Sequence, residues 1–174
     1  MPYKFNIQNF SNSYLIKPIK SQLDNEFIHY TAQVAPREQI ADPQNTWVTS
    51  VDPTIQQGAG VSPAIMVYNP YYNLFLGDSE QLVPMGSPNS NANGTVAGSF
   101  TFSSTDTSFK FVFKTNQAGY YTIYLDDPSI TDKSTLTKRL VCDRNNKNRV
   151  MITDATIVPN NLSADDRWII NFVN

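Results

Sequence analysis

The chain has 174 residues and a mass of 19.6 kDa, a size that suits one domain with a hydrophobic core of its own. Its formal net charge is −2 and its pI is about 5.2, so it lacks the basic face with which a nucleic-acid-binding protein displaces counterions from phosphates. No window is apolar enough to span a bilayer, and we expect no membrane insertion.

The cysteine content and the first residues bear on localisation. The single cysteine, Cys142, excludes an intramolecular disulfide and favours a reducing compartment. The first residues contain no apolar signal segment. We therefore expect a cytoplasmic protein, or one that is secreted without a signal peptide.

Segments rich in β-forming residues and separated by turn residues run through the chain. In the first third they cover residues 3–9, 14–16, 27–34 and 46–51, and a linker containing Pro53, Gly58 and Gly60 follows. Because Pro and Gly interrupt regular structure, this linker separates the first unit from the second.

The same scheme occurs twice more. The second unit has β-type segments at residues 64–68, 74–76, 95–102 and 108–113, and the third at 120–125, 136–142, 149–153 and 167–173. Apolar residues never recur at helical spacing over a useful length. The sequence predicts an all-β protein of twelve strands in one domain, with units at about 1–60, 61–117 and 118–174.

Two alignments support three tandem units. Residues 3–9, 63–69 and 120–126 align as copies of one segment, each of which ends in Asn or Asp. The fourth strands align on a large aromatic residue, which is Trp47, Phe109 and Trp168 in turn. Three four-strand units of this kind resemble a β-trefoil. This resemblance implies a closed six-strand barrel capped by three hairpins, with the three aromatics filling the base of the barrel.

Within that fold the chain resembles the ricin-B-like lectins, which carry Gln-x-Trp at the fourth strand of each unit. The corresponding triplets here keep the aromatic residue but not the Gln. The resemblance also implies a sugar-binding Asp just after the second strand, where its carboxylate accepts paired hydroxyls. Asp78 and Asp143 occupy those positions in the second and third units, whereas the first unit has no Asp there.

Neighbouring residues suit the same role. Tyr72 and Asn73 come shortly before Asp78, and Asn145 follows Asp143. An aromatic face with a carboxylate or an amide is a common way to hold a neutral sugar. The alternative is that Asp and Asn at strand ends only cap turns. Carbohydrate binding is the first hypothesis, with glycans as partners.

Two other functions remain open. Units of this length also resemble the Kunitz-type and fungal trefoil protease inhibitors, which present a rigid loop to a target protease. The candidate inhibitory loop contains Asn69, Pro70, Tyr71 and Asn73, and an Asn there suits an Asn-specific protease. The third hypothesis is a toxin-associated or cell-surface protein-recognition module that uses exposed tyrosines.

The sequence argues against an enzyme. The only histidine, His29, lies in an apolar segment, and no nucleophile motif accompanies it. One His and one Cys do not make a zinc site, and no calcium loop or Gly-rich phosphate loop occurs. We expect no cofactor and no metal. The unpaired thiol and the exposed aromatics leave a homodimer open.

Overall fold

The computed structural model describes residues 2–21, 29–35, 42–56, 60–78, 94–101, 109–116, 119–143, 148–154 and 164–173. These residues form strands, turns and two short 3-10 helices, η1 (Pro43–Asn45) and η3 (Lys133–Thr135), without an α-helix. None of the helices in the described ranges is long and apolar enough to cross a membrane. The prediction of an all-β chain is therefore confirmed for the part that the structure describes.

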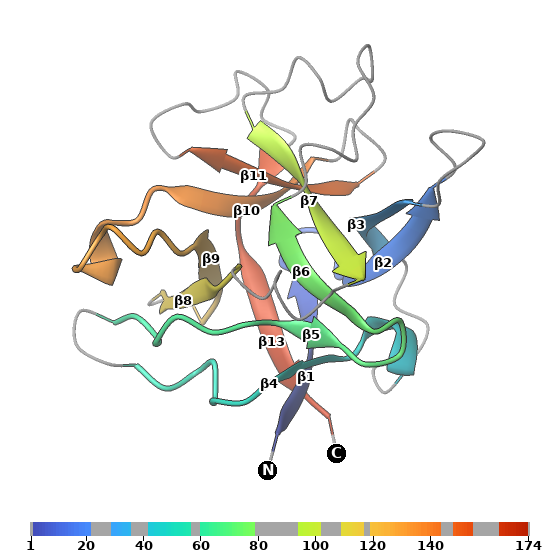
Figure 1. The fold of residues 1–174 in the computed structure, drawn as a ribbon, viewed down its shortest axis with the longest axis horizontal. Coiled ribbons are helices and arrows are strands. Elements are labelled where there is room, and N and C mark those ends of the chain that lie inside the picture. Colours follow the sequence, from blue (N-terminus) through green and yellow to red (C-terminus); the bar gives the residue numbers. More distant parts are fainter. Residues whose placement is uncertain are drawn as a thin grey trace.

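The described residues form thirteen strands, which belong to one curled antiparallel sheet (Figure 1). This is one strand more than the sequence predicts, because β12 is a separate strand of two residues. The strands are β1 (Tyr3–Asn9), β2 (Leu15–Ser21), β3 (His29–Ala35), β4 (Trp47–Thr49), β5 (Tyr68–Asn69), β6 (Leu74–Asp78), β7 (Gly94–Thr101), β8 (Phe111–Thr115), β9 (Tyr121–Leu125), β10 (Lys138–Asp143), β11 (Arg149–Asp154), β12 (Ala164–Asp165) and β13 (Trp168–Phe172).

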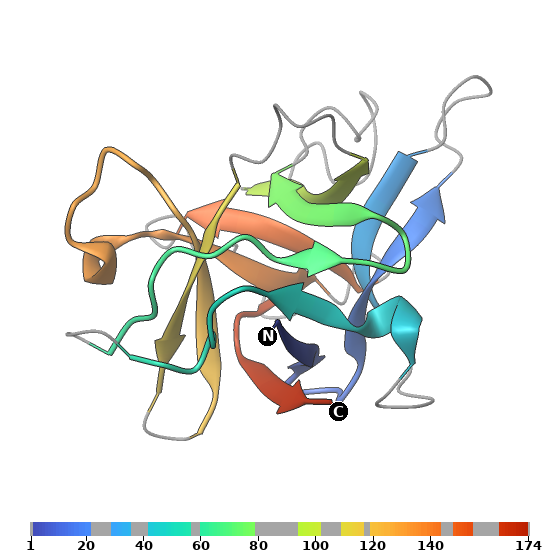
Figure 2. The same cartoon turned by 60° about the horizontal axis from the view of Figure 1, so that its bottom comes forward.

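Six strands close into a ring. β1 pairs with β4 and β13, β4 with β5, and β9 with β8 and β13. An antiparallel bridge between Ile65 and Phe111 joins the segment before β5 to β8 and completes the circle. The two ends of the chain lie side by side as a result (Figure 2). Ring closure leaves these strands without a free edge on which another chain could add.

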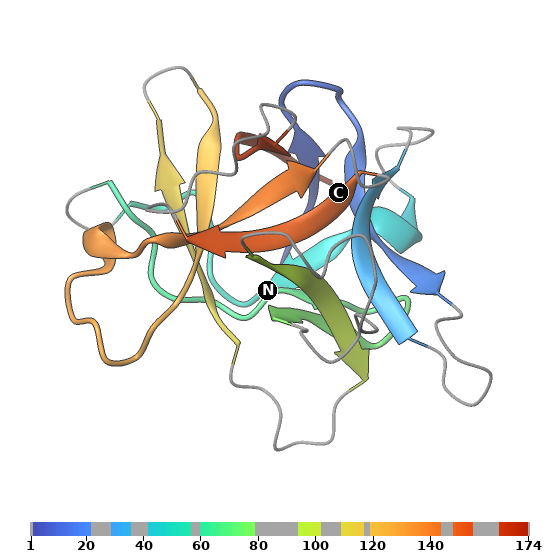
Figure 3. The ribbon, with the colours of Figure 1, turned by 90° about the horizontal axis from the view of Figure 1, so that it is seen from above.

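Three hairpins lie against this ring. They are β2–β3, β6–β7 and β10–β11, and one strand of each pairs with one strand of the other two. Seen from above, β3, β7 and β11 surround a common axis (Figure 3). The hairpins thus cover one end of the ring.

The core contains the predicted aromatics. Trp47 and Trp168 are fully buried in one cluster, and Phe109 packs against it while remaining partly exposed. Each indole N–H donates to a main-chain carbonyl of the hairpin that precedes it in the chain, at 2.9 Å to Ile16 on β2 and 3.2 Å to Leu140 on β10. A buried Trp is tolerated because its N–H finds such a partner.

The pairing register corrects the predicted position of the second aromatic. Trp47 lies opposite Phe5, as Phe111 lies opposite Ile65. Phe111, which is fully buried, therefore takes the place that the sequence assigned to Phe109. The two residues have the same parity in the strand, so the alternation of apolar residues alone does not distinguish them.

The register also corrects the third copy of the repeated segment. Trp168 lies opposite Tyr121, so Tyr121 and Ile123 occupy the places of Phe5 and Ile7. The third copy therefore spans residues 119–125, one residue earlier than the predicted 120–126. Side chains alternate between the two faces of a strand, and a slip of one residue exchanges them. Tyr120, Tyr121 and Tyr124 place aromatic residues on both faces of the strand, so the sequence pattern alone does not determine the register.

Candidate functional site

Two turns in equivalent places share one backbone conformation. The first turn, residues 9–13, follows β1, and the second turn, residues 69–73, follows β5. Asn9 Oδ1 accepts the main-chain N–H groups of the second and third residues after it, at 3.2 and 3.3 Å. Asn69 Oδ1 accepts the same two groups in its own turn, at 3.1 and 3.3 Å. The fifth residue of each turn, Ser13 or Asn73, has a left-handed φ of 63° or 56°.

The sequence explains this shared conformation. An Asn side chain that bonds main-chain N–H groups two and three residues ahead stabilises a tight turn, and Asn also tolerates the left-handed region. Both capping residues are fully buried. Asn69 in addition donates from Nδ2 to the carbonyl of Gln44 at 2.9 Å, which ties the second turn to the residues before β4.

The first turn is closed by charged residues near the C-terminus. Asp165 Oδ2 accepts the N–H of Ser11 at 3.1 Å, and Asp165 Oδ1 accepts Arg167 Nε at 2.8 Å. The Arg167 guanidinium lies 4.6 Å from the centroid of the Phe10 ring, and Tyr120 packs on the same ring at 5.5 Å. Phe10, the aromatic residue of this turn, thus contacts both a cation and a second ring.

The electrostatics of the first turn agree with its geometry. Burial alone would raise the pKa of Asp165, but hydrogen bonds from Arg167 and Ser11 outweigh burial and hold that pKa below its ordinary value. The same bond raises the pKa of Arg167. Both groups are charged at neutral pH and engaged with each other.

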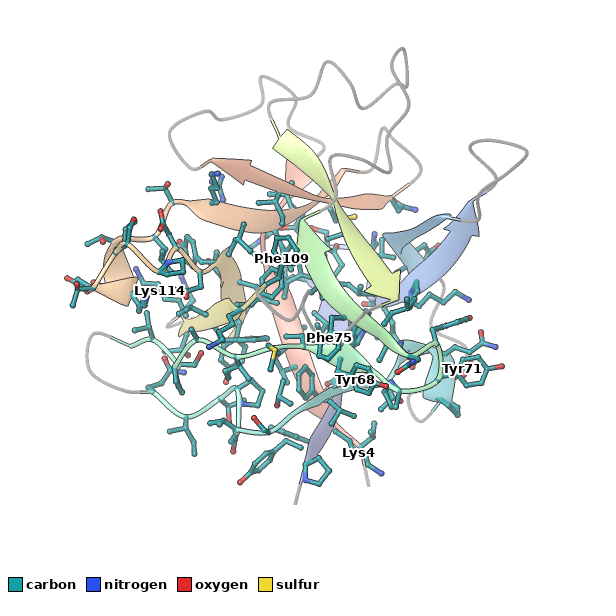
Figure 4. All side chains as sticks on the ribbon, in the orientation of Figure 1. Lys4, Tyr68, Tyr71, Phe75, Phe109 and Lys114 are labelled. Carbon is teal, nitrogen blue, oxygen red and sulfur yellow. The ribbon has the colours of Figure 1, made fainter. Side chains whose placement is uncertain are left out.

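The second turn has no such cover. Because Trp47 and Trp168 occupy equivalent places, Gln44 and Thr46 stand where the first turn has Asp165 and Arg167. Neither carries a charge. Tyr71 is 56% exposed, the largest value among the exposed hydrophobic residues of the described ranges, and it projects from the turn (Figure 4). The Tyr72 ring meets it edge-on, with the centroids 4.8 Å apart.

A cross-strand row leads away from the second turn. Lys4 on β1 lies opposite Val48 on β4, Val48 opposite Tyr68 on β5, and Tyr68 opposite Phe75 on β6. Residues directly opposite each other share a face of the sheet, so the four form one row across it. Figure 4 labels three of them, Lys4, Tyr68 and Phe75. The Tyr68 and Phe75 rings lie 4.7 Å apart at 43°.

The structure brings together only some of the predicted sugar-binding residues. Tyr72 and Asn73 lie in the second turn, at the start of β6, whereas Asp78 is the last residue of that strand. Asp78 lies five residue steps beyond Asn73 along the strand, which corresponds to about 16 Å. One sugar ring does not reach both ends, so Asp78 is not part of the surface formed by the second turn.

Asp78 and Asp143 do not occupy equivalent positions in their units. Tyr68 pairs with Phe75 as Tyr124 pairs with Arg139, so the third-unit position equivalent to Asp78 is Cys142. Cys142 is fully buried in the core. Asp143 follows one place later, opposite Arg149. Asn145 lies outside the described residues.

The predicted inhibitory loop coincides with the second turn. Pro70, Tyr71 and Asn73 are exposed, whereas Asn69 is fully buried and engaged in three hydrogen bonds. Asn69 therefore holds the turn and is not presented to a partner. Sequence reasoning missed Tyr68, although its alternation with the buried residues Val67 and Asn69 places it on the outer face.

The surface offers ring faces, amides and main-chain groups, without a charged side chain in the turn itself. Among the described residues, no group of three His, Cys, Asp or Glu side chains lies close enough to hold a metal ion. Such a surface is equipped to bind a neutral ligand with one apolar face.

A six-strand ring capped by three mutually paired hairpins defines the chain as a β-trefoil. No protein-family model matches the sequence, and neither does any curated protein.

Three similar solved structures show the fold alone, because each has low sequence identity. A GlcNAcα1-4Gal-releasing endo-β-galactosidase from Clostridium perfringens is 9% identical with a TM-score of 0.57; the match covers 99% of this chain, which spans only 33% of that enzyme. A salivary protein of the Cysteins and Tryptophan-Rich family from Culex quinquefasciatus is 12% identical with a TM-score of 0.57, over 100% of this chain and 95% of its own. The SDF2-like protein from Arabidopsis thaliana is 13% identical with a TM-score of 0.52, over 98% of this chain and 93% of its own.

Proposed function

We propose that this protein is a non-enzymatic β-trefoil that binds a neutral carbohydrate at the second turn, through Tyr71, Tyr72 and Asn73. The observation that supports the proposal is the contrast between two turns of the same backbone. In the first turn the Arg167–Asp165 ion pair and the tilted Tyr120 ring contact the aromatic residue, whereas the second turn exposes Tyr71 and Asn73 with the Tyr72 ring beside them.

The chemistry of sugars matches this surface. A pyranose has an apolar face of C–H groups that packs on an aromatic ring, and hydroxyls around its edge that bond amides. The turn is also fixed before any ligand arrives, by the Asn69 cap and the left-handed Asn73, so little ordering entropy is lost on binding. One protein of similar fold is an endo-β-galactosidase, which is compatible with a carbohydrate ligand and specifies none.

The proposal includes the internal organisation of the fold. The equivalence of Trp47, Phe111 and Trp168 in the pairing register supports three related units at about 1–60, 61–117 and 118–174. On this basis the protein would be a ricin-B-like lectin with its working surface at the second turn, because Asp165 and Arg167 engage the first. Sugar binding by Asp78 and Asp143 remains a prediction, separate from this surface.

A glycan array tests the proposal. Wild-type protein should bind at least one neutral glycan, and Tyr71→Ala should weaken that binding about two- to twelvefold, since an aromatic contact contributes about 0.5 to 1.5 kcal/mol. The matched control is Phe10→Ala, which removes the exposed aromatic residue of the closed turn and should leave affinity unchanged. Silence of wild-type protein on the array, or equal effects of the two substitutions, would contradict the proposal.

Protease inhibition is the second candidate, because the same turn is rigid and exposes Pro70, Tyr71 and Asn73. Burial of Asn69 restricts the specificity residue to Asn73 if an Asn-specific protease is the target. A protease panel run beside the array separates the two candidates. Inhibition that Asn73→Gly abolishes, together with no glycan signal, would favour the second.

A further inference from the structure

A side-chain hydrogen bond crosses the base of the second turn. The Tyr68 hydroxyl donates to Asn73 Oδ1. Tyr68 is half-buried on β5, and its ring packs against Phe75 on the neighbouring strand. Asn73 is exposed at the end of the turn. The anchored residue of the pair is therefore Tyr68, and the residue at the ligand-facing surface is Asn73.

This bond determines what the Asn73 amide can offer. A primary amide has one acceptor atom and one NH₂ group with two donors, and free rotation would let it present either. With Oδ1 bound by the phenol, rotation that would bring Oδ1 outward exchanges this bond for one from Nδ2 to the phenol oxygen, which is a weaker acceptor than an amide oxygen. The NH₂ group is the part that remains for a ligand.

We propose that Tyr68 is a positioning residue that fixes Asn73 as a hydrogen-bond donor, so that the second turn selects ligands with a neutral oxygen acceptor beside an apolar face. This inference rests on the carbohydrate function proposed above and narrows its ligand class. The acceptor is neutral because the turn and its flanking Gln44 and Thr46 carry no charge to match an anion.

The first turn lacks this arrangement. Gln8 stands directly before Asn9, as Tyr68 stands before Asn69, and its Oε1 accepts from Asn171 Nδ2 at 2.8 Å. Gln8 is buried and directed into a network with Asn6 and Asn171. The orienting phenol thus belongs to the second turn, whose aromatic residue Tyr71 is 56% exposed, against 40% for Phe10 in the first.

A double-mutant cycle on glycan affinity tests the positioning role. The probe is the strongest neutral glycan of the array, titrated calorimetrically against wild type, Tyr68→Phe, Asn73→Gly and the double variant. Tyr68→Phe keeps the ring against Phe75, and Gly accepts the left-handed φ of position 73. Each single change should weaken binding about three- to tenfold, the range of one neutral hydrogen bond. The double variant should be no weaker than Asn73→Gly, because Tyr68 acts through Asn73.

Asn73→Asp tests the donor separately. An aspartate still accepts from the Tyr68 hydroxyl but has no NH₂ group at neutral pH, so binding should fall as far as in Asn73→Gly. Full affinity in Tyr68→Phe, full affinity in Asn73→Asp, or losses that multiply in the double variant would each overturn the inference. Thermal midpoints close to that of wild type confirm that the variants are folded.

If wild-type protein binds no glycan, both the proposed function and the ligand class inferred from it are contradicted. The positioning role is then decided by the side-chain amide resonances of Asn73 in ¹⁵N–¹H spectra. They should move in Tyr68→Phe relative to wild type, and unchanged resonances would show that the phenol does not orient the amide.

Discussion

The turns at 9–13 and 69–73 differ in what surrounds them and not in how they are built. Both are capped by a buried Asn that accepts two main-chain N–H groups, and both end in a left-handed residue. Asp165 and Arg167 cover the first turn, whereas Gln44 and Thr46 leave the second open. The surroundings of each turn are therefore set by residues outside it, 154 positions away in sequence for the first turn and 25 for the second.

The largest expected effect comes from opening the first turn. Asp165→Ala removes the acceptor for the Ser11 N–H and for two groups of Arg167, and should lower the free energy of unfolding by about 2 to 3 kcal/mol. Gln44→Ala at the equivalent place should cost less than about 0.5 kcal/mol, because Gln44 serves the second turn through its main-chain carbonyl. Urea denaturation measures both, and equal losses would contradict the contrast between the turns.

Loss of a capping Asn is expected to be the next in size. Asn69→Ala and Asn9→Ala each remove the acceptor of two main-chain N–H groups and should cost about 1 to 2 kcal/mol. Asn69→Ala should also reduce glycan affinity, since its side chain accepts the main-chain N–H groups of Tyr71 and Tyr72 and so holds both rings in place. Asn9→Ala serves as its control and should leave affinity unaltered. A cap variant with wild-type stability would show that the turns hold without it.

Of the two turns, only the first should respond to acid, because Asp165 contacts it. The folded-state pKa of Asp165 lies below its unfolded value, so the unfolded chain binds the proton more readily. The stabilisation is fully present above the unfolded pKa, about 3.9, and is lost as pH falls through the folded pKa. Unfolding followed from pH 6 downward should show a loss in wild type that is smaller in Asp165→Asn. An identical pH profile for the two proteins would remove this assignment.

The smallest effect concerns the left-handed residues. Ser13→Gly should stabilise by up to about 0.5 to 1 kcal/mol, because Gly adopts this φ without a steric penalty. Asn73→Gly should gain less, since Asn tolerates the conformation and the change also removes the bond from Tyr68. Thermal melts of the two variants provide the comparison, and a larger gain at 73 would contradict it.

Much of the fold could be predicted from local pattern. The alternation around Phe5 and Ile7, the turn chemistry after Asn9 and Asn69, and the large aromatics at the fourth strands all act within a few residues. The predicted register of the repeated strands was wrong at two places. The second aromatic of the core is Phe111 and not Phe109, and the third copy begins one residue earlier than its tyrosines suggest, because several residues of similar character compete for one place.

The candidate site was predicted in part. Tyr71, Tyr72 and Asn73 were recognised as an aromatic turn, but Asp78 was placed beside them when an extended strand separates it from them. Asn69 was expected at the surface and is buried, because a cap that serves two main-chain groups has to lie beneath the turn. Tyr68 was missed, because only the folded turn brings Asn73 Oδ1 within hydrogen-bond distance of the Tyr68 hydroxyl.

The sequence by itself determined that the chain is built of strands, that two of its turns are capped by Asn, and that large aromatics fill the core. These properties depend on side-chain period and on bonds between neighbours in the chain. The tertiary structure alone decided which turn is covered, because the covering charges of Asp165 and Arg167 come from the other end of the chain. Ring closure brings those ends together, and no local pattern records such a contact.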